Sequence, residues 1–351
     1  MSPLPPSLGT PLTQLRLAGG SAAFQTLIAA GCTLVESHLV APNTQRTYAS
    51  PIQLFEQFCH THDRAALPAS HETVFAFLMF RASTASSYAV IKAASGAIYH
   101  MHNRAGFADP AIPTRHPLVQ NLKLSLKRIL GETVRNRKDP LLTPDLISIC
   151  DILTLTPTDP VTLMLCTMCS VMFAGCLRYS DAAQLLSSDI TLFPDHVELF
   201  LAKRKNDQFR HGDLLVLAKG SSSACPHRLL TAYLPLVQPS APLFQSFNGY
   251  TYSLLAVPSN PDSRTGHPIR DDQCRRYIRK LIQHCPQLPP DAVQRFATHS
   301  LRIGSATVVA AATDISEAAF RRHGGWRSDA SLRYIHADLQ RRLATSKQLG
   351  Y

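Results

Sequence analysis

The stretch Thr298-His299-Ser300-Leu301-Arg302 is the most informative part of this chain of 351 residues. Read as a helix, it places His299 and Arg302 on one face, because side chains three residues apart are neighbours. Arg178 adds a second guanidinium from upstream, and Tyr334 follows downstream. Planar guanidinium groups match the non-bridging oxygens of a phosphate, so this set predicts a site where one phosphate is held and attacked.

The charge balance points to a polyanionic partner. The chain has 35 Lys and Arg residues against 24 Asp and Glu residues, a formal net charge of +11, and a sequence pI of about 9.4. A surplus of this size favours nucleic acid. A basic protein without such a partner is the alternative that charge alone leaves open.

The nine cysteines are irregularly spaced, and Cys166, Cys169 and Cys176 lie in apolar stretches. We interpret them as reduced core thiols. Cys166 and Cys169 have metal-ligand spacing, but no second Cys or His pair matches them, which disfavours zinc. No signal peptide is evident, and no apolar segment approaches the length of a membrane span. These features predict a soluble, intracellular protein, located in the nucleus if its source is eukaryotic.

Hydrophobic periodicity predicts a mainly α-helical protein of two domains. Residues 1–20 are rich in Pro, Ser, Gly and Leu without a sustained period, which is typical of a flexible arm. Residues 21–131 predict a helical domain, with helices at 21–39, 44–62, 71–81, 86–104 and 116–130. The stretch 132–140 (ETVRNRKDP) is rich in Arg and Lys and has no apolar period, so it predicts a basic linker.

Residues 141–351 predict a second, mostly α-helical domain with a small antiparallel β element. Thr143 before Pro144 predicts a helix start with Thr143 as the N-cap, and the stretch 158–160 predicts another start. The period then changes to two at 196–201 and 213–217, which predicts two strands on either side of a charged tip. Further helices are expected from Pro226, Asp271, His299, Ser316 and Asp329.

Each candidate site residue also has a purely structural explanation when taken singly. Arg178 follows a strongly apolar helix and needs an anion, which a salt bridge could supply. Tyr334 could be a core aromatic beside Leu332 and Ile335. As a nucleophile it would need electrostatic help, because a phenol with a pKa of about 10 is almost fully protonated at neutral pH. The ordered set is much more specific than any one member.

The set resembles the catalytic domain of the tyrosine recombinases, the phage-integrase type of site-specific recombinase, over about residues 140–340. Arg178 with Asp181 is similar to the family's first arginine motif and its acidic companion. His299-x-x-Arg302 is similar to the second box. Trp326, after Gly325, stands where the family has His or Trp, and Tyr334 resembles the nucleophile.

The charged tip between the predicted strands resembles the hairpin that carries the family's lysine. Lys203 and Lys205 both fit the position of this lysine. We favour Lys205, because the sequence of residues 204–208 has the better local resemblance to the family. The stretch 324–335 is more similar to recombinases of eukaryotic Crypton and DIRS-type mobile elements than to bacterial integrases. Its spacing from Trp326 to Tyr334 is one residue shorter than in phage and bacterial members.

The resemblance implies that DNA strands are broken and rejoined. Tyr334 would attack the scissile phosphate of duplex DNA, form a 3′-phosphotyrosyl link and release a 5′-hydroxyl. Arg178 and Arg302 would stabilise the charge that develops on the phosphorus. Because the phosphotyrosine keeps the bond energy, the resemblance implies no cofactor, neither ATP nor a divalent metal.

The remaining members of the set would move the proton or support the site. Lys205 would protonate the leaving 5′-oxygen, since a cationic pocket lowers the pKa of an ammonium. His299 would assist proton transfer or hold a non-bridging oxygen. Trp326 would pack against the phosphate or donate its indole N–H to it, and Asp181 would orient Arg178 or His299.

By position and helix count, the first domain resembles the family's helical, SAM-like core-binding domain. Basic residues of this domain, the linker and the hairpin tip are candidates for DNA contacts, although each could lie on a solvated face. These candidates are Lys92, Arg104, Lys123, Lys127, Arg128, Arg135, Arg137, Lys138, Lys203 and Arg204. The resemblance also implies a dimer on one DNA site and a tetramer on two, with the tail after Tyr334 docked on a neighbour or capping its own subunit.

Two other functions compete with recombination. One is a type IB topoisomerase, against which Trp326 and the small N-terminal helical domain argue. The other is a domesticated DNA-binding protein that has lost catalysis, against which the completeness of the set argues. The target DNA sequence, the choice between integration, excision and inversion, and the accessory factors are not determined by the sequence.

Overall fold

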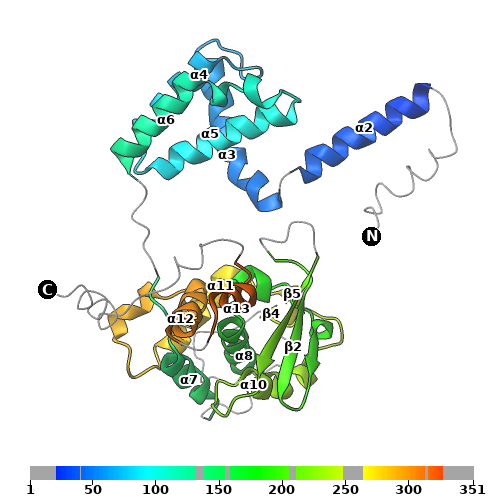
Figure 1. The fold of residues 1–351 in the computed structure, drawn as a ribbon, viewed down its shortest axis with the longest axis vertical. Helices are drawn as coiled ribbons and strands as arrows, with labels where there is room; N and C mark the ends of the chain where they lie inside the picture. The colour runs from blue at the N-terminus through cyan, green and yellow to red at the C-terminus, as the bar shows by residue number, and fades with distance from the viewer. Residues whose placement is uncertain are drawn as a thin grey trace. The chain divides into compact units, whose positions relative to one another are not determined.

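The computed structural model describes residues 21–39, 41–131, 138–154, 159–204, 211–247, 264–312 and 315–326. The chain forms two compact units, Met1–Arg135 and Asn136–Tyr351, which divide within the stretch 132–140. Helices dominate both units (Figure 1), as the periodicity predicts. The expected arm at 1–20, most of the linker and the expected helix from Asp329 lie outside the described residues.

The N-terminal unit is helical, and its helices start and end close to the predicted positions. They are α2 (Ser21–His38), α3 (Pro42–Thr61), α4 (His71–Ala82), α5 (Tyr88–Arg104) and α6 (Pro117–Leu130). Helices α3 to α6 share one core, in which the rings of Phe55 and Phe77 lie 5.0 Å apart. Ser70 caps α4 by accepting a hydrogen bond from the amide of Thr73, at 3.2 Å.

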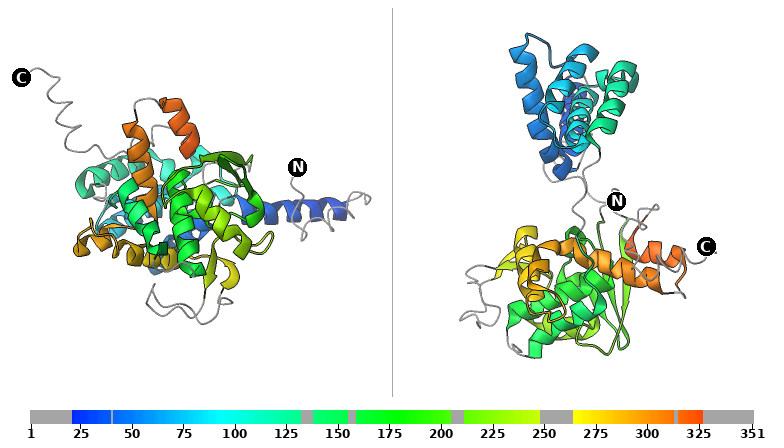
Figure 2. Two further views of the ribbon diagram at one scale, coloured as in Figure 1. Left: turned by 90° about the horizontal axis from the view of Figure 1, so that it is seen from below. Right: turned by 90° about the vertical axis from the view of Figure 1, so that its left-hand side faces the viewer.

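The C-terminal unit is built around α8 (Pro160–Ala174), which is apolar on nearly all sides and therefore buried. Helices α7 (Thr143–Asp151), α10 (Pro226–Tyr233), α11 (Asp271–Ile282) and α12 (Thr298–Ala311) pack against α8. The short α9 (Tyr179–Ala182) follows α8, and α13 (Glu317–Gly324) lies beside α12 (Figure 2). Short 3₁₀ turns lie at 152–154, 187–189, 234–236 and 290–295 in this unit, and at 109–111 and 113–115 in the N-terminal unit.

A three-stranded antiparallel sheet covers one side of this unit. Its order is β1 (Ile190–Leu192), β2 (His196–Leu201), β3 (Asp213–Ala218), and the pairing of Leu199 with Leu215 faces the core. Strands β2 and β3 match the prediction, whereas β1 is too short to show a period. A second antiparallel pair, β4 (Gln245–Phe247) and β5 (Arg264–Pro268), was not predicted.

One predicted helix cap is wrong by one residue. Helix α7 has Leu142, not Thr143, as its N-cap, because the carboxylate of Asp145 accepts a hydrogen bond from the Leu142 amide at 2.8 Å. At α8 the second predicted start is found, with Asp159 accepting from the amide of Val161 at 3.1 Å.

The thiols of Cys166, Cys169 and Cys176 are buried in the C-terminal unit, and all nine cysteines of the chain are free thiols. Burial raises the pKa of Cys169, so this group stays protonated and unreactive. Within the described part of the chain, every helix is too short or too polar to span a bilayer.

Candidate active site

Arg302 joins three parts of the C-terminal unit. It lies on α12 and is fully buried. Its Nη1 donates to the carbonyl of Cys176, and its Nη2 donates to the carbonyl of Gly324 at 2.9 Å. Its guanidinium carbon lies 4.2 Å from the ring centroid of Trp326. The guanidinium of Arg302 therefore connects α12, which carries the His299-x-x-Arg302 motif, to the turn before Arg178 and to the turn that carries Trp326.

The turn before Arg178 has an unusual backbone conformation. Cys176 has a φ of 46°, a left-handed value that is uncommon for residues other than glycine. Its carbonyl accepts from Arg302, and its Sγ lies 2.6 Å from the Oγ of Ser305 on α12. Burial raises the pKa of the Cys176 thiol, against the opposing influence of Ser305 and Arg302. Packing against α12 thus holds this turn, which the sequence pattern did not identify.

The turn that carries Trp326 requires both of its glycines. Helix α13 ends in a Schellman motif, in which the amide of Trp326 donates to Arg321 at 2.9 Å and that of Gly325 to Arg322 at 3.1 Å. Gly325 has a φ of 64°. A Cβ on Gly324 would come within 1.7 Å of the Trp326 ring. Trp326 is 5% exposed, so the turn places its ring in the interior of the protein.

Arg178 and Asp181 lie together at the start of α9. The backbone amide of Arg178 donates to Oδ2 of Asp181 at 3.2 Å, and the Arg178 Nη1 lies 3.8 Å from the same oxygen. This Nη1 is buried and has no hydrogen-bond partner among the described residues. A buried donor without an acceptor is costly, so the position favours an anion that completes it. Asp181 therefore lies beside the Arg178 guanidinium, and its part in orienting Arg178 or His299 stays a prediction.

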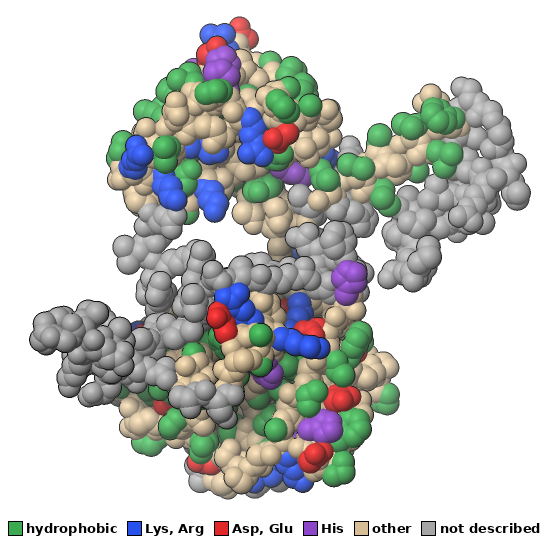
Figure 3. All heavy atoms as spheres, in the orientation of Figure 1, with side chains coloured by type: hydrophobic (Ala, Val, Ile, Leu, Met, Phe, Trp, Pro, Cys, Tyr) green, Lys and Arg blue, Asp and Glu red, His purple; other side chains and the backbone are tan. Residues whose placement is uncertain are grey.

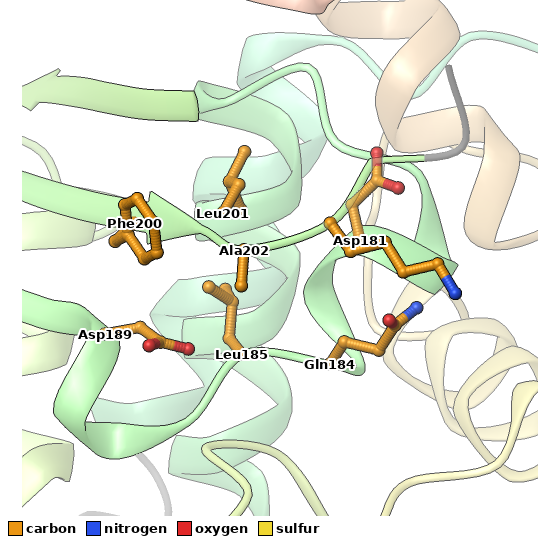
Figure 4. A pocket seen from close by; sticks show the side chains of 8 residues that line it. Asp181, Gln184, Leu185, Asp189, Phe200, Leu201 and Ala202 are labelled. Atoms are coloured by element: carbon orange, nitrogen blue, oxygen red, sulfur yellow. The ribbon is translucent and has the colours of Figure 1, made fainter. Parts of the chain in front are cut away.

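His299 and Lys203 are exposed at two edges of the same unit. His299 lies one turn before Arg302 on α12. Lys203 follows β2 and lines a shallow hollow together with Asp181 and Gln184. Figure 4 shows this hollow between the α9 segment, with Asp181 and Gln184, and the end of β2, with Ala202. The base of the hairpin is therefore close to the first arginine motif.

Two members of the predicted set, Lys205 and Tyr334, lie outside the described residues. The choice between Lys203 and Lys205 consequently stays a prediction, as does the nucleophile. The described members come from four separate segments: 178–181, the end of β2, α12, and the turn after α13.

Two expected DNA contacts, Arg204 and Lys138, make hydrogen bonds within the protein. Arg204 is 5% exposed, and its Nη1 donates to the carboxylate of Asp213 at 2.5 Å. Lys138 is partly buried and donates to the carbonyl of Gln294 at 3.1 Å. The intramolecular ion pair turns the Arg204 guanidinium away from DNA, whereas Lys138 keeps further N–H donors, so its contact with DNA stays a prediction.

Other candidate contacts lie on the surface of the N-terminal unit, where Figure 3 shows Lys and Arg side chains gathered around α6. Lys127 and Arg128 are exposed in the last turn of α6. The amide of Tyr88 donates to the carbonyl of Gly131, at 3.1 Å, so the start of α5 adjoins the end of α6. Exposed Lys92 therefore lies at the same end of the unit.

The remaining basic candidates do not all join this group. Arg104 is exposed at the opposite end of α5, roughly 18 Å from Lys92 along the helix axis. Lys123 is partly buried, and burial together with the nearby Arg115 lowers its pKa. Arg135 and Arg137 lie outside the described residues.

The fold is that of the tyrosine recombinases, as solved structures show. The XerH site-specific recombinase, in a post-cleavage complex with its palindromic difH substrate, matches with a TM-score of 0.53 and 15% identity over 97% of this chain and 86% of that one. The lambda integrase tetramer bound to a Holliday junction matches with a TM-score of 0.52 and 14% identity, over 89% and 77% of the two chains. The Tn1549 transposon integrase with transposon right end DNA matches with a TM-score of 0.50 and 12% identity, over 91% and 97%.

Sequence comparison agrees with the fold. An integrase/recombinase xerD homolog from Selenomonas ruminantium is 26% identical over 298 residues, 84% of this chain and 82% of that protein. No family model matches the sequence. This homologue and these structural neighbours are integrases and recombinases, and the fold that they share with the chain is that of the tyrosine recombinases.

Proposed function

We propose that this chain is a site-specific recombinase that cleaves and rejoins duplex DNA through a 3′-phosphotyrosyl intermediate. The observation that carries the proposal is the position of Arg302, which binds the turn before Arg178 and stacks on Trp326. One buried guanidinium thereby brings together α12, the turn before Arg178 and the turn that carries Trp326, within a tyrosine recombinase fold.

The chemistry begins with attack of the Tyr334 oxygen on the scissile phosphorus. A phosphorus–oxygen bond to tyrosine forms while the bond to the 5′-oxygen breaks. The hairpin lysine, Lys205 or Lys203, gives the leaving oxygen its proton. Rejoining reverses these steps, when a 5′-hydroxyl of the partner strand displaces the tyrosine. No net bond energy is lost, so the reaction needs no external energy source.

The arginines stabilise the charge of the transition state. Arg178 offers a buried Nη1 for which the described residues provide no hydrogen-bond acceptor, so a non-bridging phosphate oxygen would complete it. The carboxylate of Asp181 lies 3.8 Å from the same Nη1 and would orient the guanidinium. His299, exposed at the start of α12, is assigned to proton transfer or to a second non-bridging oxygen, and Trp326 to the wall of the site.

Exposed Lys92, Lys127 and Arg128 would hold the DNA backbone, because they share one end of the N-terminal unit. The structural neighbours include DNA complexes and a tetramer on a Holliday junction. By analogy, this chain would bind one DNA site as a dimer and recombine two sites as a tetramer. Its resemblance to Crypton and DIRS-type recombinases remains a prediction about its branch of the family.

The first experiment is a trapping reaction on nicked duplexes without metal. The wild-type protein, Tyr334→Phe and Tyr351→Phe are incubated with candidate terminal sequences and run on a denaturing gel. A covalent protein–DNA band that Tyr334→Phe loses and Tyr351→Phe keeps supports the proposal. Bound DNA on native gels without any covalent band would favour the domesticated DNA-binding protein. Relaxation of supercoiled DNA by the monomer would favour the topoisomerase.

A further inference from the structure

Arg204 occupies an unusual position for a residue in a basic run. Its neighbour Lys203 is exposed, whereas Arg204 is 5% exposed and is bonded on two sides. Nη1 donates to the carboxylate of Asp213 at 2.5 Å, and Nη2 donates to the carbonyl of His323 at 3.4 Å. The side chain therefore belongs to the interior and not to the basic surface.

The first of these contacts closes the base of the β2–β3 hairpin. Asp213 is the first residue of β3 and is paired in register with Leu201, the last residue of β2. The ion pair joins Asp213, a member of this last pair, to Arg204, three residues past the end of β2. Both ends of the segment 205–212 are thus tied together by one interaction.

The second contact ties the hairpin to the turn that carries Trp326. The carbonyl of His323 belongs to the last turn of α13, where backbone carbonyls lack partners within the helix and the helix dipole attracts a cation. The guanidinium also packs against Gly325, where a Cβ would come within 2.6 Å of Nη1. Arg302 satisfies the next carbonyl, that of Gly324. Two arginines from distant segments therefore cap the end of α13.

We propose that Arg204 is a positioning residue, which fixes the base of the β2–β3 hairpin against the end of α13 and so places the hairpin lysine relative to Arg302 and Trp326. The inference rests on the proposed function. It holds for either candidate lysine, because Lys203 and Lys205 both flank Arg204 in the chain, and consecutive Cα atoms are about 3.8 Å apart.

The geometry requires arginine and not merely a positive charge. Only a planar fork reaches the carboxylate on β3 and the carbonyl on α13 with separate nitrogens. A lysine could satisfy one of them. Arg204→Lys should consequently act as a partial loss, and Asp213→Asn, which removes the charge of the partner, should resemble it.

The test uses the full-length chain and two DNA substrates that differ in one atom. One has the ordinary 5′-oxygen at the scissile phosphate, and the other has sulfur there. A thiolate leaves without being protonated, so the sulfur substrate does not depend on the lysine. Single-turnover formation of the covalent complex is measured for wild type, Arg204→Ala, Arg204→Lys and Asp213→Asn. Arg228→Ala, an exposed arginine on α10, is the matched control.

We expect Arg204→Ala to slow cleavage of the oxygen substrate by ~100-fold, because a catalytic group displaced by about 1 Å, here the hairpin lysine, loses about that much rate. Arg204→Lys and Asp213→Asn should slow it less. All three variants should cleave the sulfur substrate nearly as fast as wild type. Their salt dependence of DNA binding should not change. The fluorescence of Trp326, the only tryptophan in the chain, reports whether the turn after α13 has loosened.

Three results would overturn the inference. The variants could cleave the oxygen substrate at the wild-type rate, or lose activity equally on both substrates, which indicates general structural damage. A reduced salt slope would make Arg204 a phosphate contact after all. If wild type itself formed no Tyr334-dependent complex with either substrate, the proposed function would fail, and that outcome is distinct from the other three.

Discussion

The guanidinium carbon of Arg302 lies 4.2 Å from the ring centroid of Trp326, and both side chains are buried. A cation over an indole face contributes about 2 kcal/mol when it is desolvated. The same guanidinium also bonds to the carbonyls of Cys176 and Gly324. Arg302 therefore supports the structure of the site in addition to its proposed part in catalysis.

The two arginines of the site should respond differently to replacement by lysine. Arg302→Lys leaves a buried carbonyl without its donor, so we expect the free energy of unfolding to fall by about 2–3 kcal/mol. Arg178→Lys should cost less than about 1 kcal/mol, because the Arg178 Nη1 makes no hydrogen bond with the described residues that the change would remove. Urea denaturation followed by the emission of Trp326 measures both changes.

Both lysine variants should slow covalent-complex formation by roughly 10²–10³-fold, since each removes a planar donor from the developing charge. Equal stability losses in the two variants would contradict the structural part assigned to Arg302.

Gly325 should tolerate alanine less well than another glycine of positive φ. Gly106 has a φ of 86° with open space around it, so Gly106→Ala isolates the backbone cost of about 1–2 kcal/mol. Gly325→Ala adds a contact with Arg204 and should cost about 1 kcal/mol more. Gly220, with neither constraint, is the neutral control. Thermal unfolding ranks the three variants, and a smaller loss for Gly325 than for Gly106 would refute the packing argument.

His102 should make the N-terminal unit less stable at acidic pH. The ring is buried, its Nε2 accepts from the amide of Ala69 at 3.0 Å, and its Nδ1 donates to the carbonyl of Ile98 at 2.9 Å. Burial lowers the pKa of His102 below its usual 6.5, and that of His100 is lowered for the same reason. The unfolded chain then binds more protons, so stability is complete above about pH 6.5 and is lost as the pH falls below it.

Hydrogen exchange in α5 of the full-length chain, corrected for intrinsic rates, measures this pH dependence. His102→Gln should flatten the slope between pH 5 and 7 and keep only the part due to His100. His60→Gln, an exposed change on α3, should leave the slope as in wild type. An unchanged slope in His102→Gln would show that the ring is not the titrating group.

The basic end of the N-terminal unit should control how strongly DNA binding depends on salt. In a Tyr334→Phe background, which blocks cleavage, replacing Lys92, Lys127 and Arg128 by Gln should reduce the logarithmic salt slope by about 2–3. Arg64→Gln, an exposed change in the same unit, serves as the control. Native-gel affinities at several salt concentrations give the slopes, and equal slopes for the triple variant and wild type would place the DNA elsewhere.

The sequence alone determined most of the described helices and the two long strands, and it carries the order of the proposed catalytic residues. Periods of 3.6 and 2 are local properties, so α3 to α6 and the β2–β3 hairpin could be predicted close to their bounds. Strand β1 and the β4–β5 pair are too short to show a period, and Asp145 displaced the predicted cap of α7 by reaching back to Leu142.

Only the tertiary structure decided which side chain of a basic run faces inward. Lys203 and Arg204 are adjacent cationic residues, yet one is exposed and the other binds Asp213 and the end of α13. The left-handed turn at Cys176, which gives its carbonyl to Arg302, is equally invisible in the sequence. Arg204 and His323 are more than a hundred positions apart in the chain, as are Cys176 and Arg302, and a local pattern carries no information about such distant partners.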